Sequence, residues 1–387
     1  MLKFAKKVAH VARLSRCSSR CAIKRFAHSK VESLDKAFLK DDMPTYVAHL
    51  PPVSQYGGQT VITLLYADTG IGQRACKHLK SLIEISKLPI TFENVPISRS
   101  SATVAGEDYY SLLRNRTAVY LDLELDTESL QKRYQLNRQL DLFACIAKFK
   151  SHPGYNCKRT NVNIWSYSQN NVGDYAKLEY EPVKGVVETL RITTVEKLSQ
   201  FLRFAFGEAL KNGRRKITIG HKADMLPKSD GLFLELAQRI HQEEYECLEL
   251  NDMKINTMAR NIVMNPEKFD VICSQSGYGR IINAAISAVC GGASLFSCVD
   301  LGERFAVFKP LEMKLALSDC REISPYGVVR LCIELLCYLG KEDCAKLIAL
   351  ELSDVMCRGI KTEEFGGKDR PDFVICSIVN NLQCHFA

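Results

Sequence analysis

Hydrophobic positions along the chain follow two periods, one typical of buried strands and the other typical of helices. Continuous or alternating apolar runs predict strands at residues 60–67 (TVITLLYA), 90–97 (ITFENVPI) and 117–125 (TAVYLDLEL). Between the first two runs, residues 75–86 (ACKHLKSLIEIS) have helical spacing. Strands that alternate with helices predict an α/β fold whose sheet is covered by helices.

The clearest predicted helix lies in residues 193–213. Thr193 and Glu196 match a capping box at its start, and Gly213 is a typical C-terminal stop. Its apolar stripe consists of Leu198, Phe201, Leu202, Ala205 and Ala209. A short strand, ITIG, follows at 217–220 and ends just before Lys222.

Three other segments give coarser predictions. Residues 31–57 are polar and contain prolines, which predicts a linker into the fold. Residues 272–285 (ICSQSGYGRIINAA) predict a strand, a Gly-Tyr-Gly turn and the start of a helix. Two apolar helices are expected in 324–356, the first beginning at Ser324-Pro325.

The positive charge is concentrated at the N-terminus. Residues 1–30 hold nine of the 52 Lys and Arg residues and no acid, so the remainder, with 43 bases and 44 acids, is nearly neutral. A basic, acid-free leader with interleaved apolar residues is typical of a mitochondrial transit peptide, and we expect a matrix protein. A disordered basic tail or a nucleic-acid arm is the alternative for the leader itself.

The rest of the chain lacks the features of nucleic-acid binding and of membrane insertion. Its near-zero charge offers no electrostatic surface for a phosphate backbone. No apolar run reaches the roughly 18 residues that a membrane span needs.

The sixteen cysteines are scattered, mostly within apolar runs. No CxxC pair occurs, so the usual zinc spacing is absent from the sequence. In a reducing compartment the pattern predicts free thiols, most of them buried.

An ordered series of motifs carries a family resemblance. The Gly-x-Gly of YADTGIGQ (66–73) is weak alone, but it precedes VGDYAKLEYEPVKGVVETLRITT (172–194), HKADMLPKSDGLFLE (221–235) and GYGRIINAA (277–285). From about residue 50 to the end, the series resembles the β-decarboxylating dehydrogenases of the isocitrate/isopropylmalate dehydrogenase family. Within that family it is most similar to gamma-type, regulatory subunits of mitochondrial NAD-dependent isocitrate dehydrogenase.

The resemblance implies an α/β fold in two parts. A large doubly wound domain would comprise residues 58–145 and 291–387. A smaller α/β domain, 146–290, would carry a clasp that pairs subunits. The active cleft would lie between the domains and borrow residues from the neighbouring subunit.

The resemblance also implies which residues would act. A tyrosine and a lysine serve in proton transfers, and the chain retains Tyr175 and Lys222 at these positions. Lys222 follows a strand's carboxyl end, where open α/β sheets bind ligands. It could reach into a partner's active site or bind an effector carboxylate. A packed aromatic and a solvated lysine are the alternatives without function.

The sequence departs from the family at the other site positions. Asn137, Ala147 and Ser168 stand where three substrate arginines are expected, and the cofactor-binding loop has no match. The aspartates that hold Mg²⁺ or Mn²⁺ are replaced by Asn256, Arg280 and Ala284. Three lost charge-assisted hydrogen bonds remove on the order of 5–9 kcal/mol of substrate stabilisation. An arginine would also repel the metal, so we expect no metal site there.

Three functions follow. The first is a non-catalytic subunit that forms a hetero-oligomer with a catalytic subunit holding NAD and metal, and that senses citrate and ADP. The second is an active dehydrogenase with an altered substrate, in which Arg133, Arg138 and Arg280 form an anion-binding cluster. The third is a stand-alone scaffold that binds anions.

Overall fold

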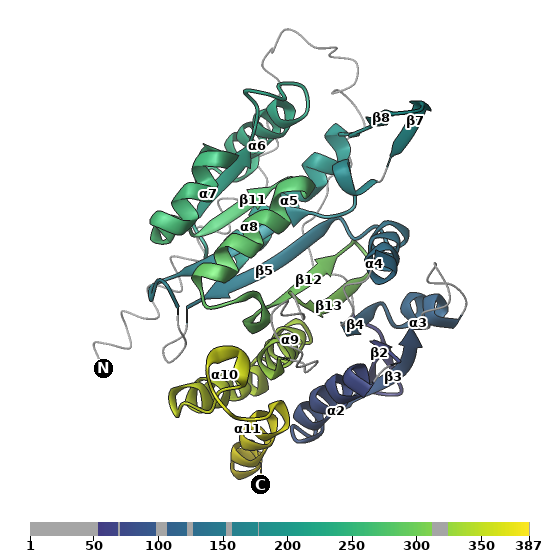
Figure 1. The fold of residues 1–387 in the computed structure, drawn as a ribbon, viewed down its shortest axis with the longest axis vertical. Coiled ribbons are helices and arrows are strands. Elements are labelled where there is room, and N and C mark those ends of the chain that lie inside the picture. The colour runs from purple at the N-terminus through teal and green to yellow at the C-terminus, as the bar shows by residue number, and fades with distance from the viewer. Residues whose placement is uncertain are drawn as a thin grey trace.

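A single mixed sheet forms the centre of the molecule (Figure 1). The computed structural model describes residues 53–68, 70–97, 107–121, 127–151, 157–176, 178–311 and 324–386. The sheet has eleven strands in the order β1-β2-β4-β13-β12-β5-β6-β11-β9-β10, with β3 also paired to β2. The leader lies outside the described residues. The last residues of the expected linker form strand β1, which pairs with β2, so the linker ends earlier than predicted.

The strands are antiparallel through the middle of the sheet, from β13 through β12 and β5 to β6, and at the edge where β1 pairs with β2. The other neighbouring strands are parallel. Their bounds are β1 Gln55–Tyr56, β2 Gln59–Ala67, β3 Ile90–Ile97, β4 Thr117–Leu121, β5 Ala144–Lys150, β6 Asn163–Gln169, β9 Lys216–His221, β10 Glu249–Lys254, β11 Val271–Ser274, β12 Ser297–Leu301 and β13 Ala306–Pro310. The predicted strands at 60–67, 90–97 and 217–220 are confirmed. The strand predicted at 117–125 is confirmed as far as Leu121, the last of its residues before a gap in the described chain.

Helices cover the sheet along its length (Figure 1). Their bounds are α2 Gly70–Glu84, α3 Glu107–Asn115, α4 Thr127–Gln139, α5 Val195–Lys211, α6 Asp230–Glu244, α7 Ile255–Met264, α8 Ser276–Val289, α9 Pro325–Tyr338, α10 Glu342–Cys357 and α11 Pro371–Phe386. The two apolar helices expected near the C-terminus are α9 and α10. Helix α11 was not predicted. Within the described residues, no helix combines the length and the apolar character needed to cross a membrane.

Helix α5 confirms the hydrophobic pattern and corrects its predicted cap. Each residue of the apolar stripe is fully buried in the core. The N-cap is Thr194 and not Thr193, because the Thr194 hydroxyl accepts from the Lys197 N–H at 3.4 Å. Gly213 takes φ +72°, as expected for a residue that ends a helix.

The Gly-Tyr-Gly segment was predicted to form a turn before a helix, and this prediction was wrong. The segment lies within the first turn of α8. Its glycines allow close packing. A Cβ on Gly279 would lie 2.2 Å from the Ser168 Cβ, and one on Gly277 would lie 2.1 Å from Asp174 Oδ2. Helix α8 therefore rests directly on the end of β6.

The sheet is continuous where the sequence predicts a domain boundary. Residues 145 and 146 both lie inside β5, which pairs with β12 on one side and β6 on the other. One hydrophobic core cluster includes buried residues from both predicted parts. The division into two domains remains a prediction.

A small hairpin stands apart from the sheet (Figure 1). Strands β7 (Glu179–Val183) and β8 (Val186–Thr189) pair only with each other among the described strands. Every residue of both strands is exposed, including the apolar Val183, Val186 and Val187. The hairpin lies in the segment where the resemblance implies a clasp.

The prediction of free thiols is confirmed for twelve cysteines of the described chain, and eight of these are buried or partly buried. The exposed ones are Cys247, Cys337, Cys357 and Cys376.

Candidate functional site

Lys222 lies where the sequence places it, directly after β9. Its backbone N–H donates to Asp230 Oδ2 at 2.8 Å. Its carbonyl oxygen accepts from the N–H groups of Met225 and Leu226 at 3.0 and 2.9 Å. The loop that begins with Lys222 is therefore fixed by backbone contacts, while the lysine side chain is only partly buried.

Arg191 holds this loop to the rest of the site. Its Nη1 lies 3.2 Å from Oδ1 of Asp230, which is fully buried at the start of α6. Its Nη2 donates to the Gln275 side chain, and its guanidinium lies 5.6 Å from the centre of the Tyr278 ring. Arg191 thus joins the loop after β9 to the start of α8. Arg191 lies within the motif at 172–194, but the sequence offered no reason to assign it a role. No neighbouring residue indicates that it pairs with the buried Asp230.

Tyr175 lies in the short 3₁₀ helix Gly173–Ala176, close to this network. The neighbouring Asp174 has its Oδ1 3.7 Å from Arg191 Nε. The position of the Tyr175 side chain is outside what the structure describes, so its role stays a prediction.

The three positions expected to have lost metal ligands carry no carboxylate and differ in exposure. Asn256 and Ala284 are exposed, on α7 and α8. Arg280, also on α8, is partly buried, and its Nη1 donates to the Tyr134 hydroxyl of α4 at 2.7 Å. Its guanidinium also lies 4.6 Å from the Tyr134 ring centre. An amide, a guanidinium and a methyl group do not make a Mg²⁺ or Mn²⁺ site, because these ions require oxygen ligands that include carboxylates.

The proposed anion cluster is brought together only in part. Arg133 and Arg280 both lie against Tyr134, at 5.8 and 4.6 Å from its ring centre. Arg138 is exposed and donates to the Ala176 carbonyl at 3.2 Å. Because Arg133 and Arg138 are five residues apart on α4, they point in different directions around the helix.

The three substrate-arginine positions are buried. Asn137, Ala147 and Ser168 have exposed fractions of 1, 1 and 4%. Ser168 lies under Gly279 of α8, so a long side chain at 168 would meet the helix backbone. The positions where the resemblance implies substrate arginines therefore lie on a closed, tightly packed surface.

Several polar atoms on and around this surface have no hydrogen-bond partner among the described residues. They include Ser166 Oγ, Ser274 Oγ, Asn137 Nδ2, Asn283 Oδ1 and Arg133 Nε. A buried polar atom without a partner costs free energy.

One buried ion pair lies on the same face of the sheet as Ser168. Asp300 of β12 and Lys309 of β13 are 1 and 7% exposed at the side chain and hydrogen-bonded to each other. Burial alone would raise the pKa of Asp300, but the Lys309 ammonium, a hydrogen bond from Cys145 and, more weakly, Arg133 hold it below its usual range.

Comparison with known proteins gives a consistent result. A sequence model of the isocitrate/isopropylmalate dehydrogenase family matches residues 75–381. The chain is 31% identical over 327 residues to an NAD isocitrate dehydrogenase subunit 1, mitochondrial, of Ajellomyces capsulatus, with 81% of this chain and 84% of that protein covered. It is 28% identical over 342 residues to a probable NAD isocitrate dehydrogenase gamma 2, mitochondrial, of Rattus norvegicus, with 86% of each covered.

The gamma subunit of Bos taurus is 32% identical over 268 residues, which are 67% of each chain. Among solved structures, an isocitrate dehydrogenase from Methylococcus capsulatus superposes with a TM-score of 0.77 at 23% identity. This match covers 84% of the present chain and 99% of that one. At this identity the superposition shows a shared fold.

Proposed function

Because the chain belongs to the isocitrate/isopropylmalate dehydrogenase family, we propose that it is a non-catalytic subunit of a mitochondrial NAD-dependent isocitrate dehydrogenase. In this role it assembles with a catalytic subunit that oxidises and decarboxylates isocitrate to 2-oxoglutarate in the tricarboxylic acid cycle. The names of the curated relatives support the complex, and the site of this chain supports the non-catalytic role.

The observation that carries the proposal is the environment of Arg280. A guanidinium stands where the resemblance implies a metal carboxylate, and it donates a hydrogen bond to the Tyr134 hydroxyl. The family reaction needs a divalent cation to stabilise the enolate left by CO₂. A fixed positive charge opposes that cation, and the neighbouring Asn256 and Ala284 supply no compensating negative charge.

The cofactor belongs to the partner in this proposal. The segment expected to replace the NAD-binding loop, within residues 310–320, lies almost wholly outside the described residues. The catalytic subunit would hold both NAD and Mg²⁺ or Mn²⁺, and the present chain would contribute residues to that site.

Two features support a contribution to a partner. Lys222 projects from a loop that Asp230 and Arg191 fix in place, which suits a residue that must reach a neighbouring cleft. The exposed β7–β8 hairpin offers unpaired strand edges and apolar side chains for pairing with another chain.

Effector binding is a second part of the proposal. Arg133 and Arg280 place two positive charges around Tyr134, a chemistry that suits citrate or the phosphates of ADP. Binding would require Arg280 to exchange its tyrosine partner for the anion.

The site of action is the mitochondrial matrix. The basic leader predicts import, and the matched relatives are named mitochondrial.

Co-expression with a catalytic-type subunit tests the assembly. We expect the two chains to co-purify and the complex to form NADH from isocitrate with Mg²⁺, while the present chain alone forms none. Absence of association would remove the proposal, and turnover by the isolated chain would support the altered-substrate enzyme instead.

A matched pair of variants tests the role of Lys222. Lys222→Met in the complex should lower kcat at least about tenfold, the range for loss of a positioned proton-transfer group. Lys228→Met, which changes an exposed lysine of the same loop, should leave kcat unchanged. Equal effects of the two variants would contradict a contribution from Lys222.

A titration tests the effector role. Citrate or ADP should lower the isocitrate concentration for half-saturation of the complex, and Arg280→Met should remove this shift. An unchanged half-saturation in the unmodified complex would exclude the effector role.

A further inference from the structure

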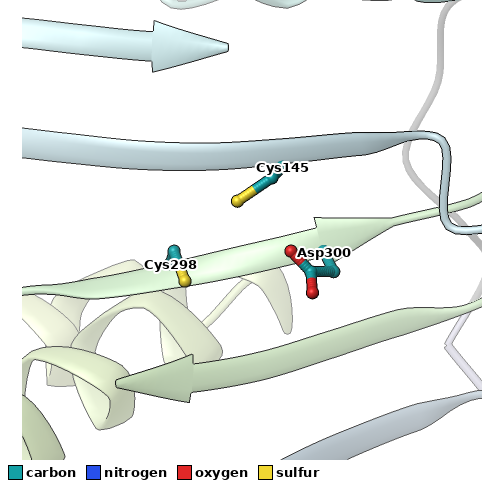
Figure 2. A group of neighbouring side chains, drawn as sticks. All are labelled: Cys145, Cys298 and Asp300. Carbon is teal, nitrogen blue, oxygen red and sulfur yellow. The ribbon is translucent and has the colours of Figure 1, made fainter. Parts of the chain in front are cut away.

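Cys145, Cys298 and Asp300 form a compact cluster of metal-ligand side chains (Figure 2). Their sulfur and carboxylate oxygen atoms all lie within 4.8 Å of one another. Cys145 is on β5 and directly opposite Asp300 of β12, while Cys298 is two residues before Asp300. Side chains two residues apart on a strand share a face, so the sheet register brings the three together.

The offset between the two cysteines disfavours a disulfide. Cys298 is opposite Ala147, so Cys145 and Cys298 are diagonal neighbours. Diagonal positions on paired strands have Cβ atoms roughly 6–7 Å apart, whereas a disulfide needs about 3.5–4.5 Å. Two zinc–sulfur bonds of about 2.3 Å place the sulfurs close to 4 Å apart, which the cluster can reach with a small contraction.

The three side chains interact with one another. The Cys145 thiol lies against both Cys298 and Asp300, and this contact raises the pKa of Cys145 and lowers the pKa of Cys298 and of Asp300. Asp300 Oδ2 is paired with Lys309, while Oδ1 is buried and makes no hydrogen bond to a nitrogen or oxygen of a described residue. The two sulfurs and a carboxylate oxygen therefore surround the position that a metal ion would take.

Charge balance favours a divalent ion. Two thiolates and one carboxylate carry −3, and Lys309 reduces this to −2. The positions opposite Cys145 and Cys298 are Ser168 and Ala147, both uncharged. The resemblance places arginines at both, and a guanidinium beside each thiolate would have repelled a cation.

We propose that Cys145, Cys298 and Asp300 bind one soft divalent cation of the zinc class, with water as the fourth ligand and Lys309 remaining on Asp300 Oδ2. Thiolate ligands select zinc over the hard Mg²⁺ and Mn²⁺ ions that the family uses in catalysis. The inference concerns different residues from the proposed subunit role and does not depend on it.

Cobalt titration of the full chain tests the site. The reduced, chelator-treated protein should bind one Co²⁺ with intense thiolate charge-transfer bands and the visible bands of tetrahedral cobalt, and stoichiometric Zn²⁺ should abolish both. Excess Mg²⁺ should leave the spectrum unchanged. Because at least the Cys145 proton is displaced, affinity should rise about tenfold or more per pH unit below neutrality.

Matched serine variants identify the ligands. Cys145→Ser and Cys298→Ser should each weaken Co²⁺ binding on the order of 100-fold or more, the upper range for disturbed metal sites. Cys247→Ser, which changes an exposed thiol, should bind normally. Unfolding curves of the metal-free proteins show whether each variant is folded.

Two results would overturn the proposal. One is a metal-free wild-type protein that is folded and gives no thiolate–cobalt band. The other is a band that persists when both cysteines are serine. Peroxide treatment followed by peptide mapping provides a further check, because a Cys145–Cys298 disulfide formed in the folded protein would contradict the diagonal geometry.

Discussion

Two regions of the molecule share the same sheet but differ in how their buried polar groups are paired. In the loop after β9, Asp230 and Arg191 form a largely buried ion pair at 3.2 Å, and Asp230 Oδ2 accepts from the Lys222 backbone. Asp230 Oδ1 and Arg191 Nε make no hydrogen bond to the described residues, so this region is held by the ion pair and the backbone contact. On the face under α4 and α8, Ser166, Ser274 and Asn137 each have a buried polar atom without a partner in the described chain. We call these the paired loop and the replaced face.

This difference agrees with the proposal that Lys222 still acts while the chain's own catalytic site is lost. An ion pair keeps its geometry only if both of its residues remain. The pair of Asp230 and Arg191 is therefore consistent with a retained role for Lys222. The replaced face lacks the arginines and carboxylates that the resemblance implies for a substrate and metal site. Several of its polar atoms, such as Ser166 Oγ and Asn137 Nδ2, have no hydrogen-bond partner among the described residues and therefore contribute little to stability.

The largest expected effect comes from breaking the paired loop. Asp230→Ala leaves the mostly buried Arg191 without its carboxylate and should lower the free energy of unfolding by about 3–5 kcal/mol. Urea denaturation measures the change. Asp224→Ala, in the same loop but exposed and paired with Lys254, should have no measurable effect. A small loss for Asp230→Ala would remove the distinction between the regions.

Restoring an arginine to the replaced face should be costly. Ser168→Arg forces a long side chain against the α8 backbone at Gly279, with an expected loss of about 1–3 kcal/mol from overpacking. Thermal or urea unfolding compares it with Ser168→Ala, which adds no volume. If the arginine variant were as stable as wild type and bound isocitrate, the face would still be a substrate surface.

The contact between Arg280 and Tyr134 should have an intermediate effect. Tyr134→Phe removes one hydrogen bond and keeps the ring, so we expect a loss of about 0.5–1.5 kcal/mol. A double-mutant cycle with Arg280→Met isolates the pairwise term from the rest of the tyrosine's contribution. Zero coupling would show that Arg280 is held by other contacts.

The smallest effect should come from a polar atom without a partner. Ser166→Ala removes a buried hydroxyl that bonds no described residue, so stability should change by less than about 0.5 kcal/mol or rise slightly. Ser151→Ala is the control, because that hydroxyl donates to the Thr160 carbonyl at 2.7 Å and accepts from the Val162 N–H at 3.0 Å. Its loss should cost about 1 kcal/mol. Equal losses for the two serines would reveal a partner of Ser166.

Local sequence patterns predicted the elements that carry these regions. The stripe of α5, the strand at 217–220 and the position of Lys222 at its end all follow from hydrophobic period and stop signals within some twenty residues. The Thr193 cap and the Gly-Tyr-Gly turn were wrong, because the backbone geometry around a helix start depends on what the helix packs against. For α8 that contact is Ser168, more than a hundred residues earlier.

The sequence by itself determined the α/β class and the main elements, and through the family resemblance it predicts the loss of charged site residues. It contains no CxxC pair, so it offered no signal for a metal site. Only the tertiary structure decided that Arg191 meets Asp230, that Arg280 bonds Tyr134, and that Cys145 and Cys298 lie near Asp300. The physical reason is that hydrophobic period is set by neighbouring residues, whereas these partners are set by strand register and helix packing between distant segments.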